Sequence, residues 1–312
     1  MKKKILITGG SGFLGRSLAK KLNKKYTVYL GSRNNSNNYE AAEECKVNFV
    51  PLDVSNINSI YDAIDLTKPE IIIHAAATKF VGLSEEYPYE CIDTNILGSS
   101  NLARASINKK IKIVVGISTD KAAQPIENLY GMSKATMEKI FISSNNISNT
   151  KFTCLRFGNI AWSTGSVFPI WKRMHEKNKI INTTGPFMTR FFFTSDEAAN
   201  FVILSIDKIK KFSGKIVCPE MKSIQILAIL KRWIKRRGGK YKIVKRRIGD
   251  KDHETLIGQN EINNTYFQLF NKKKYFFIDT KKNINLKFLK SELNSQNSKR
   301  MGISEIDKLI NY

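Results

Sequence analysis

The sequence predicts an α/β fold, a Rossmann-type doubly wound parallel sheet with a smaller C-terminal substrate-binding region. Through the first half of the chain, short runs rich in Ile and Val, apolar on both faces, alternate with amphipathic stretches. This pattern is typical of buried βαβ units. After residue 160 the alternation stops, and segments containing Gly, Pro and Thr follow with isolated helices between them. At 312 residues the chain can bury a full core without disulfides.

The expected elements follow in chain order. Strands are predicted at residues 4–8, 27–31, 47–53, 70–77, 111–119 and 152–160, with helices at 12–22, 57–64 and 94–107. The Asn-rich stretch 34–38 is predicted to be a loop, and later helices are predicted near 167–177, 195–209 and 223–237. We assign residues 1–165, with 190–218 returning to them, to a dinucleotide-binding domain, and residues 166–189 and 219–312 to the substrate-binding region.

Cysteine usage and hydropathy argue against a disulfide scaffold, a metal site and a membrane span. The four cysteines contain no C-x-x-C pair, which indicates reduced thiols in a cytoplasmic protein. The first apolar run ends at Gly9, too early for a secretory signal. No segment reaches the ~18 uninterrupted apolar residues of a membrane span. We therefore expect a soluble protein without a metal site.

The chain is strongly basic, with 52 Lys and Arg against 27 Asp and Glu, a formal net charge of +25. Such a charge could serve nucleic-acid or anionic-membrane binding. The chain is also crowded with Asn and Ile, which share A/T-rich codons with Lys, and its basic residues concentrate only at 236–247. We therefore interpret the charge as compositional and expect no specific nucleic-acid partner.

A glycine-rich turn, TGGSGFLG, follows the first predicted strand and opens a helix. Glycine permits the tight turn and the approach of a pyrophosphate to the positive end of that helix, so this context predicts dinucleotide binding. Residues at the ends of the third and fourth predicted strands would reach the adenine and the ribose of the cofactor. The residues expected against the cofactor are Gly9, Ser11, Gly12, Phe13, Leu14, Gly15, Ser32, Arg33, Asp53, Val54, Ala75, Ala76 and Ala77.

The end of the second strand favours NADP over NAD. An NAD enzyme often has an acidic residue there for the ribose hydroxyls, whereas this chain has Ser32 and Arg33. A guanidinium suits the 2′-phosphate of NADP. The alternative is a solvated loop arginine, with NAD as the cofactor.

Tyr130 and Lys134 form a candidate redox pair. Three Tyr-x-x-x-basic matches occur, but Tyr29/Arg33 and Tyr241/Lys245 lie in predicted strands, where residues four apart do not stack. Tyr130 and Lys134 open a predicted helix and share one of its faces. A nearby ammonium lowers the pKa of a phenol, so Tyr130 is expected to take a proton from a sugar hydroxyl while hydride leaves the same carbon.

A second candidate pair, Asp120 and Lys121, follows the fifth strand. Together with Thr119 these residues stand at the carboxyl end of that strand, facing the same crevice as Tyr130. An oxidation does not need them. The structural alternative is that Asp120 caps a turn and that Lys121 is a surface residue.

The chain resembles a known family through motifs in consistent order. TGGSGFLG, HAAATK, STDKA, YGMSK, RFGNI, GSVFP, MTRFF and HETLI resemble the extended short-chain dehydrogenase/reductases. More narrowly they are similar to the soluble UDP-N-acetylglucosamine 4,6-dehydratases that invert carbon 5, in bacterial surface-sugar pathways. The resemblance extends to about residue 257.

The resemblance implies a use for the second pair. A transient ketone at carbon 4 acidifies the proton on carbon 5. Asp120 would then protonate the leaving hydroxyl on carbon 6, and Lys121 would remove the carbon 5 proton. This requires a protonated Asp120 and a neutral Lys121, which burial favours and a direct ion pair between them opposes.

The resemblance also implies substrate contacts. Lys79 and Asn159 should contact the sugar or its diphosphate, and Ser166 and Val167 should border the nicotinamide and the substrate. Thr189, Arg190, His253 and Glu254 would hold the UDP moiety, with Arg190 on the phosphates; for His253 the alternative is an ordinary loop histidine. A homo-oligomer formed through the helices that flank the sheet, including the one that starts at Tyr130, is expected as well.

The chain departs from the family pattern at three places. Ser163-Thr164-Gly165 stands where relatives have Ser-Arg-Gly, so one positive contact is missing. Glu127 is an extra loop residue. Some close relatives have Met at the place of Tyr130, so this tyrosine favours an intact oxidation but leaves the configuration at carbon 5 open.

Two other interpretations remain open at this point. A nucleotide-sugar 4-epimerase or reductase of the same fold would use Tyr130 and Lys134 but not Lys121. A non-catalytic NADP-binding protein would need none of the three, and the intact Tyr130/Lys134 pair argues against it.

Overall fold

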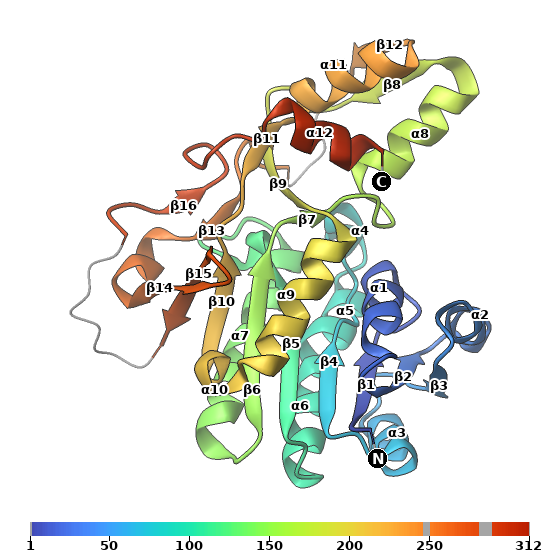
Figure 1. The fold of residues 1–312 in the computed structure, drawn as a ribbon, viewed down its shortest axis with the longest axis vertical. Helices are drawn as coiled ribbons and strands as arrows, with labels where there is room; N and C mark the ends of the chain where they lie inside the picture. The colour runs from blue at the N-terminus through green and yellow to red at the C-terminus, as the bar shows by residue number, and fades with distance from the viewer. Residues whose placement is uncertain (1, 246–249, 281–288, 312) are drawn as a thin grey trace.

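A nine-stranded sheet forms the centre of the computed structural model, which describes residues 2–245, 250–280 and 289–311 (Figure 1). Seven strands run parallel in the order β3-β2-β1-β4-β5-β6-β10, and β15 and β14 add to the β10 edge in antiparallel pairing. Their bounds are β1 Lys4–Thr8, β2 Thr27–Ser32, β3 Asn48–Pro51, β4 Ile71–His74, β5 Ile113–Thr119, β6 Lys151–Phe157, β10 Lys215–Pro219, β14 Thr265–Phe270 and β15 Lys273–Asp279. The predicted doubly wound α/β class is confirmed.

Helices cover both faces of this sheet. Figure 1 shows α9 in front of the strands and α6 and α7 behind them. The helices are α1 Phe13–Leu22, α2 Asn35–Cys45, α3 Ile57–Thr67, α4 Val81–Glu86, α5 Pro88–Cys91, α6 Gly98–Asn108, α7 Leu129–Ile147, α9 Ser195–Asp207 and α10 Ile209–Phe212. A π-helical turn, Ile92–Leu97, joins α5 to α6. The sheet is therefore buried on both sides, which explains why its strands are apolar throughout.

The prediction for the Asn-rich stretch was wrong. Residues 34–38 begin α2 instead of forming a loop, and Asn34 caps the helix by accepting a hydrogen bond of 2.9 Å from the backbone N–H of Asn37. Asn is a favoured N-cap residue, because its side chain satisfies an amide that the first helical turn leaves unpaired.

A second difference concerns the C-terminal part of the chain. Residues 265–279 were assigned to the substrate-binding region, but β14 and β15 extend the main sheet. In β15 the residues from Tyr275 to Ile278 are all buried, with Phe277 packed against Phe212 of α10. A short aromatic run does not reveal its partner strand, so its place in the sheet depends on tertiary packing.

A smaller lobe stands at the carboxyl end of the sheet, at the top of Figure 1. It contains α8 Val167–Asn178, α11 Ile226–Arg237, α12 Ile303–Ile310 and the parallel pair β8 Ile180–Thr183 with β12 Lys240–Ile243. Its own core is built around Phe168, Trp171 and Trp233. Two short sheets connect the lobes, one of β7 Asn159–Ile160, β9 Thr189–Phe193 and β11 Ser223–Gln225, the other of β13 Thr255–Ile257 and β16 Leu293–Asn294.

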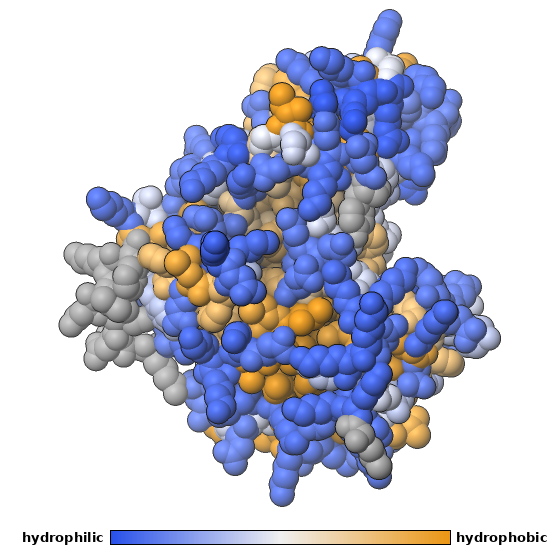
Figure 2. All heavy atoms as spheres, in the orientation of Figure 1, coloured by the Kyte–Doolittle hydropathy of each residue, from blue (hydrophilic) through white to orange (hydrophobic). Residues whose placement is uncertain are grey.

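The surface agrees with the dispersed charge of the sequence. Figure 2 shows hydrophilic residues over most of both lobes, with apolar residues between them. Residues 246 and 247, the end of the basic run, lie outside the described residues.

All four cysteines are buried free thiols. Among the described helices, none has the length and apolarity needed to cross a bilayer.

A buried arginine joins three separate segments beneath the carboxyl edge of the sheet. Arg156 on β6 is 1% exposed and donates five hydrogen bonds. Two go to Glu138 on α7 at 2.7 and 3.0 Å, and two go to Glu261 in the 3-10 turn Gln259–Asn264 at 2.7 and 2.9 Å. The fifth reaches the carbonyl of Leu256 on β13 at 2.9 Å. The guanidinium therefore ties the C-terminal segment to the sheet and to α7.

We predict that Arg156→Met lowers the free energy of unfolding by about 3 kcal/mol or more, because it leaves the buried carboxylate of Glu138 and the partly buried carboxylate of Glu261 without their counterion. Urea denaturation measures the change. Arg104→Met, at an exposed position on α6, is the control and should change stability by less than about 0.5 kcal/mol. Equal stability of the two variants would contradict a structural role for the arginine.

Candidate active site

The glycine turn between β1 and α1 has a geometry that only glycine supports at two positions. Gly9 has a φ of +66°, and a Cβ there would lie 2.7 Å from the backbone nitrogen of Ala76 after β4. At Gly15 a Cβ would lie 2.3 Å from the carbonyl oxygen of Gly10, so this glycine lets α1 pack closely onto the turn. A Cβ at Gly12 would meet only the carbonyl of Gly9 and would reduce the free space beside the helix N-terminus. This space and the helix end fit the pyrophosphate of a dinucleotide.

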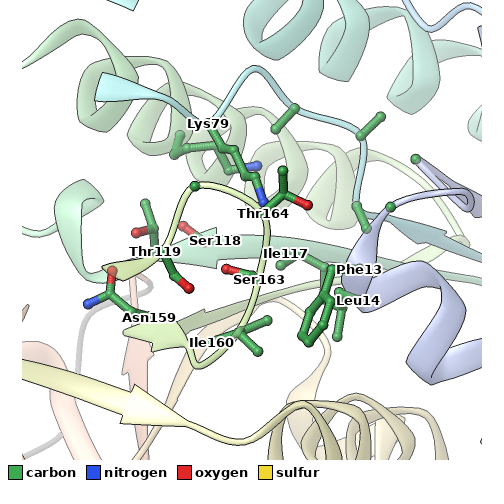
Figure 3. Close-up of a pocket in the computed structure, with 18 of the residues that line it drawn as sticks. Phe13, Leu14, Lys79, Ile117, Ser118, Thr119, Asn159, Ile160, Ser163 and Thr164 are labelled. Atoms are coloured by element: carbon green, nitrogen blue, oxygen red, sulfur yellow. The ribbon is translucent and has the colours of Figure 1, made fainter. Parts of the chain in front are cut away.

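A cavity of about 410 Å³ extends from this turn across the carboxyl ends of β4, β5 and β6 (Figure 3). In Figure 3 Phe13 and Leu14 of α1, Thr119 and Asn159, and Lys79 with Thr164 lie on different sides of it. The predicted cofactor residues that line it are Gly9, Ser11, Gly12, Phe13, Leu14, Gly15, Ala75, Ala76 and Ala77, and the predicted catalytic residues are Thr119, Lys121, Tyr130 and Lys134. The structure thus brings the glycine turn and three of the four paired side chains to one cavity.

A smaller cavity of about 230 Å³ continues on the other side of the turn. Its walls include the predicted residues Ser32, Arg33 and Val54. Arg33 is more than half exposed, and its guanidinium lies 3.5 Å from Glu90. Asp53 lines neither cavity, and its Oδ1 accepts hydrogen bonds from the amide and the hydroxyl of Ser55.

The Tyr130/Lys134 pair lies in the first turns of α7, where Asn128 caps the helix by accepting from the amide of Gly131 at 2.8 Å. The predicted lowering of the tyrosine pKa was wrong. Burial raises the pKa of Tyr130 to about 12, although Lys121 and a hydrogen bond with Thr119 act in the other direction. Burial also lowers the pKa of Lys134 to about 8, and its Nζ lies 3.0 Å from Met137 Sδ. At Tyr130 the effect of desolvation on the pKa therefore outweighs the charge of Lys121 in this structure.

The Asp120/Lys121 pair occupies a 3-10 turn, Asp120–Ala122, directly after β5. Lys121 Nζ lies 3.1 Å from Asp120 Oδ1 and 3.1 Å from Glu254 Oε1. Burial raises the pKa of Asp120 even though Lys121 opposes this. Burial tends to lower the pKa of Lys121, but the two carboxylates raise it above its ordinary value. The ion pair between Asp120 and Lys121 thus exists. The expected rise in the pKa of Asp120 is present, whereas the expected fall in the pKa of Lys121 is absent.

Asp120 is less accessible than its predicted role requires. Its side chain is fully buried and does not line the cavity, and Oδ1 accepts a hydrogen bond of 3.0 Å from Thr119 Oγ1. Its other oxygen, Oδ2, is buried and has no hydrogen-bond partner in the part of the chain that the structure describes. An unpartnered buried carboxylate oxygen is costly, and this cost favours a proton on Asp120.

The predicted substrate residues divide into two groups. Lys79, Asn159 and Ser166 line the larger cavity, and Val167 begins α8 next to it without lining it. Thr189, Arg190, His253 and Glu254 line neither cavity. They do lie together, because Thr189 Oγ1 and His253 Nδ1 share a hydrogen bond of 2.7 Å and Arg190 Nε lies 3.6 Å from Glu254 Oε1.

Sequence reasoning missed several residues at this site. Phe80, Ile117, Ser118, Phe157, Gly158 and Ile160 also line the cavity. Their common feature is a place at or just beyond the carboxyl end of a parallel strand, a signal that could have identified them. Ser295 was missed as well, because it follows β16 far from any motif, yet its hydroxyl lies 2.7 Å from Thr189 Oγ1.

A family profile described as "Polysaccharide biosynthesis protein" matches residues 5–275. The chain belongs to this family. The UDP-N-acetylglucosamine 4,6-dehydratase (inverting) of Campylobacter jejuni is 33% identical over 85% of this chain and 80% of its own length. The UDP-glucose 4-epimerase of Rickettsia bellii is 31% identical over 99% of this chain and 95% of its own length.

Solved structures agree with the fold. The X-ray structure of Pen from Bacillus thuringiensis has a TM-score of 0.90 at 27% identity, covering 99% of this chain and 97% of that one. UDP-glucose 4-epimerase from Thermus thermophilus in complex with NAD has a TM-score of 0.70 at 19% identity, covering 80% of this chain and 88% of the other. The second likeness supports the fold alone.

We predict that Gly9→Ala abolishes dinucleotide binding and lowers the melting temperature, because the new Cβ would collide with the backbone at Ala76. Gly82→Ala is the matched control, since a Cβ at Gly82 in α4 meets nothing within 4 Å. Calorimetric titration with NADP and NAD, together with thermal denaturation, measures both effects. Normal nucleotide affinity in Gly9→Ala would contradict the assigned geometry.

Proposed function

We propose that this protein is a nucleotide-sugar 4,6-dehydratase that uses NADP and acts on UDP-N-acetylglucosamine, with inversion at carbon 5, for bacterial surface-glycan synthesis. The observation that carries the proposal is that Lys121, Tyr130 and Lys134 line one cavity together with the glycine turn. The family assignment and the Campylobacter relative support it. Because the dehydratase reaction combines a redox step with an elimination, it accounts for both side-chain pairs.

The first pair serves the redox step. A bound nicotinamide would supply one function, the acceptance of the hydride from carbon 4 and its later return to carbon 6, so that the net change in the sugar is the loss of water. Tyr130 takes the proton of the carbon 4 hydroxyl, for which its pKa of about 12 in the free protein must fall. Two cations are available to stabilise the phenolate: Lys121, whose charge already lowers the pKa of Tyr130, and Lys134, whose pKa burial lowers to about 8.

The second pair serves the elimination. Lys121 accepts the proton from carbon 5, the bond between carbon 6 and its oxygen breaks, and Asp120 donates the proton that completes the water molecule. For this last step the Asp120 carboxyl group, which is buried and outside the cavity lining in the free protein, must gain access to the sugar. Transfer of one proton from Lys121 to Asp120 across their 3.1 Å contact produces the free base and the protonated acid together. Burial favours this neutral pair, because charged groups are penalised where water is excluded, whereas the carboxylate of Glu254 favours the ammonium on Lys121.

A 4-epimerase is the second candidate. The observation in its favour is that the Rickettsia bellii relative aligns along 99% of this chain, whereas the Campylobacter jejuni relative aligns along 85%. An epimerase would need Tyr130 and Lys134 but not a base at carbon 5. Lys121 therefore separates the two candidates.

We predict that purified protein with UDP-N-acetylglucosamine in heavy water yields a 4-keto product lighter by one water, with deuterium at carbon 5. Lys121→Ala should lower the rate of water loss by about a thousandfold or more while cofactor affinity stays normal. Tyr130→Phe should lower the oxidation step instead. NMR and mass spectrometry follow the sugar. Unchanged dehydration in Lys121→Ala would remove this lysine from the mechanism, and epimerisation without water loss would favour the second candidate.

We also predict that Arg33→Ala weakens NADP binding by about tenfold and leaves NAD binding within about twofold, because only NADP carries the 2′-phosphate that a guanidinium binds. Binding titrations with both nucleotides in the same variant provide the internal control. An equal loss for the two nucleotides would contradict the preference for NADP.

A further inference from the structure

We propose that Glu254 is a positioning residue for Lys121, holding its amino group at the cavity and stabilising the ammonium that forms when Lys121 accepts a proton. This inference rests on the proposed role of Lys121 as the base at carbon 5. It gives Glu254 a different role from a contact with the UDP moiety.

The geometry separates Glu254 from any ligand in the cavity. Glu254 is 3% exposed and lines neither cavity, whereas Lys121 lines the larger one. Glu254 Oε1 lies 3.1 Å from Lys121 Nζ. Of the residues that Glu254 contacts, Lys121 lines the cavity and Arg190 does not, so Glu254 can act on chemistry there through Lys121.

The protein backbone holds this carboxylate in place. The amide of Glu254 donates to Ser295 Oγ at 2.9 Å, and its carbonyl accepts from the amide of Ser295 at 2.7 Å. The next residues form β13, whose Leu256 carbonyl binds Arg156. A side chain anchored at this depth is pre-organised, which a flexible surface carboxylate would not be.

Charged and titratable groups surround Lys121 from several elements. Asp120 belongs to its own turn, Glu254 precedes β13, Arg190 approaches from β9 and Tyr130 approaches from α7. Burial alone would raise the pKa of Glu254, but Lys121 and Arg190 lower it, so Glu254 stays ionised. Its Oε2 is buried and has no hydrogen-bond partner among the described residues, so Lys121, Arg190 and Lys251 compensate the charge.

The arrangement has a defined chemical consequence. A carboxylate beside an amine makes the amine a stronger base, because it stabilises the ammonium that develops during proton removal. The same carboxylate also keeps Lys121 protonated up to a higher pH. Removing the charge of Glu254 should therefore make the Lys121 amine a weaker base. It should also lower the pH at which Lys121 loses its proton.

The test compares Glu254→Gln, which keeps the side-chain shape, with Glu254→Asp, which keeps the charge. In Glu254→Gln we expect the maximal kcat for water loss to fall about tenfold, with KM within about twofold. The acid limb of the kcat profile should move to lower pH by about one unit. Glu254→Asp should recover part of both effects. Glu127→Gln is the matched control, because this carboxylate pairs with Lys251 and is half exposed.

A second measurement needs no sugar. Trace acetylation with acetic anhydride at pH 8, read by mass spectrometry of the peptide containing Lys121, reports the neutral fraction of this amine. Glu254→Gln should accelerate labelling of Lys121 about tenfold relative to wild type, since its pKa falls by about one unit. Glu127→Gln should leave the labelling rate unchanged. Thermal denaturation and nucleotide binding confirm that each variant is folded.

A rise in KM with an unchanged pH profile would overturn the proposal and make Glu254 a substrate ligand. Unchanged Lys121 labelling in folded Glu254→Gln would also overturn it. If wild-type protein removes no water from the sugar, the proposed function fails, and the labelling experiment still decides whether Glu254 controls the proton on Lys121.

Discussion

The Arg156 guanidinium is the interaction on which the candidate site depends most. It satisfies Glu138 on α7 and Glu261 in the C-terminal segment while it is itself buried under the carboxyl edge of the sheet. Without it, the segment that carries Glu254 would lose its strongest anchor to the sheet. A buried charge of this kind contributes little net stability against an apolar core, but its partners lose stability when it is removed. With the arginine and its partners in place, β13 lies beside the turn after β5.

Burial is the second constraint on the site. It raises the pKa values of Asp120 and Tyr130 and lowers that of Lys134. Lys121 is the exception, because two carboxylates contact it and outweigh the effect of burial. The site thus combines a desolvated redox pair with a lysine whose charge is set by its neighbours. This contrast between two lysines in one cavity is a reason to assign them different chemistry.

The family assignment and the cavity both support a nucleotide-sugar-modifying enzyme, but together they do not distinguish a dehydratase from an epimerase. Relatives with dehydratase and epimerase names match this chain at similar identity, so overall similarity does not separate the two activities. The difference depends on whether one side chain, Lys121, removes a proton from carbon 5. Fold likeness cannot answer such a question, because many chemistries share this sheet and differ in a few residues at its edge.

The sequence by itself determined the class of fold, the glycine turn, the placement of Tyr130 and Lys134 on one helix and the position of Asp120 and Lys121 after a strand. These are local features, governed by the periodicity of side chains and by the conformational freedom of glycine. Tertiary structure alone decided that β14 and β15 join the main sheet, that Asp120 is hidden from the cavity and that Glu254 contacts Lys121. Burial and long-range contacts set these properties, because the pKa of a side chain depends on neighbours that lie far along the chain.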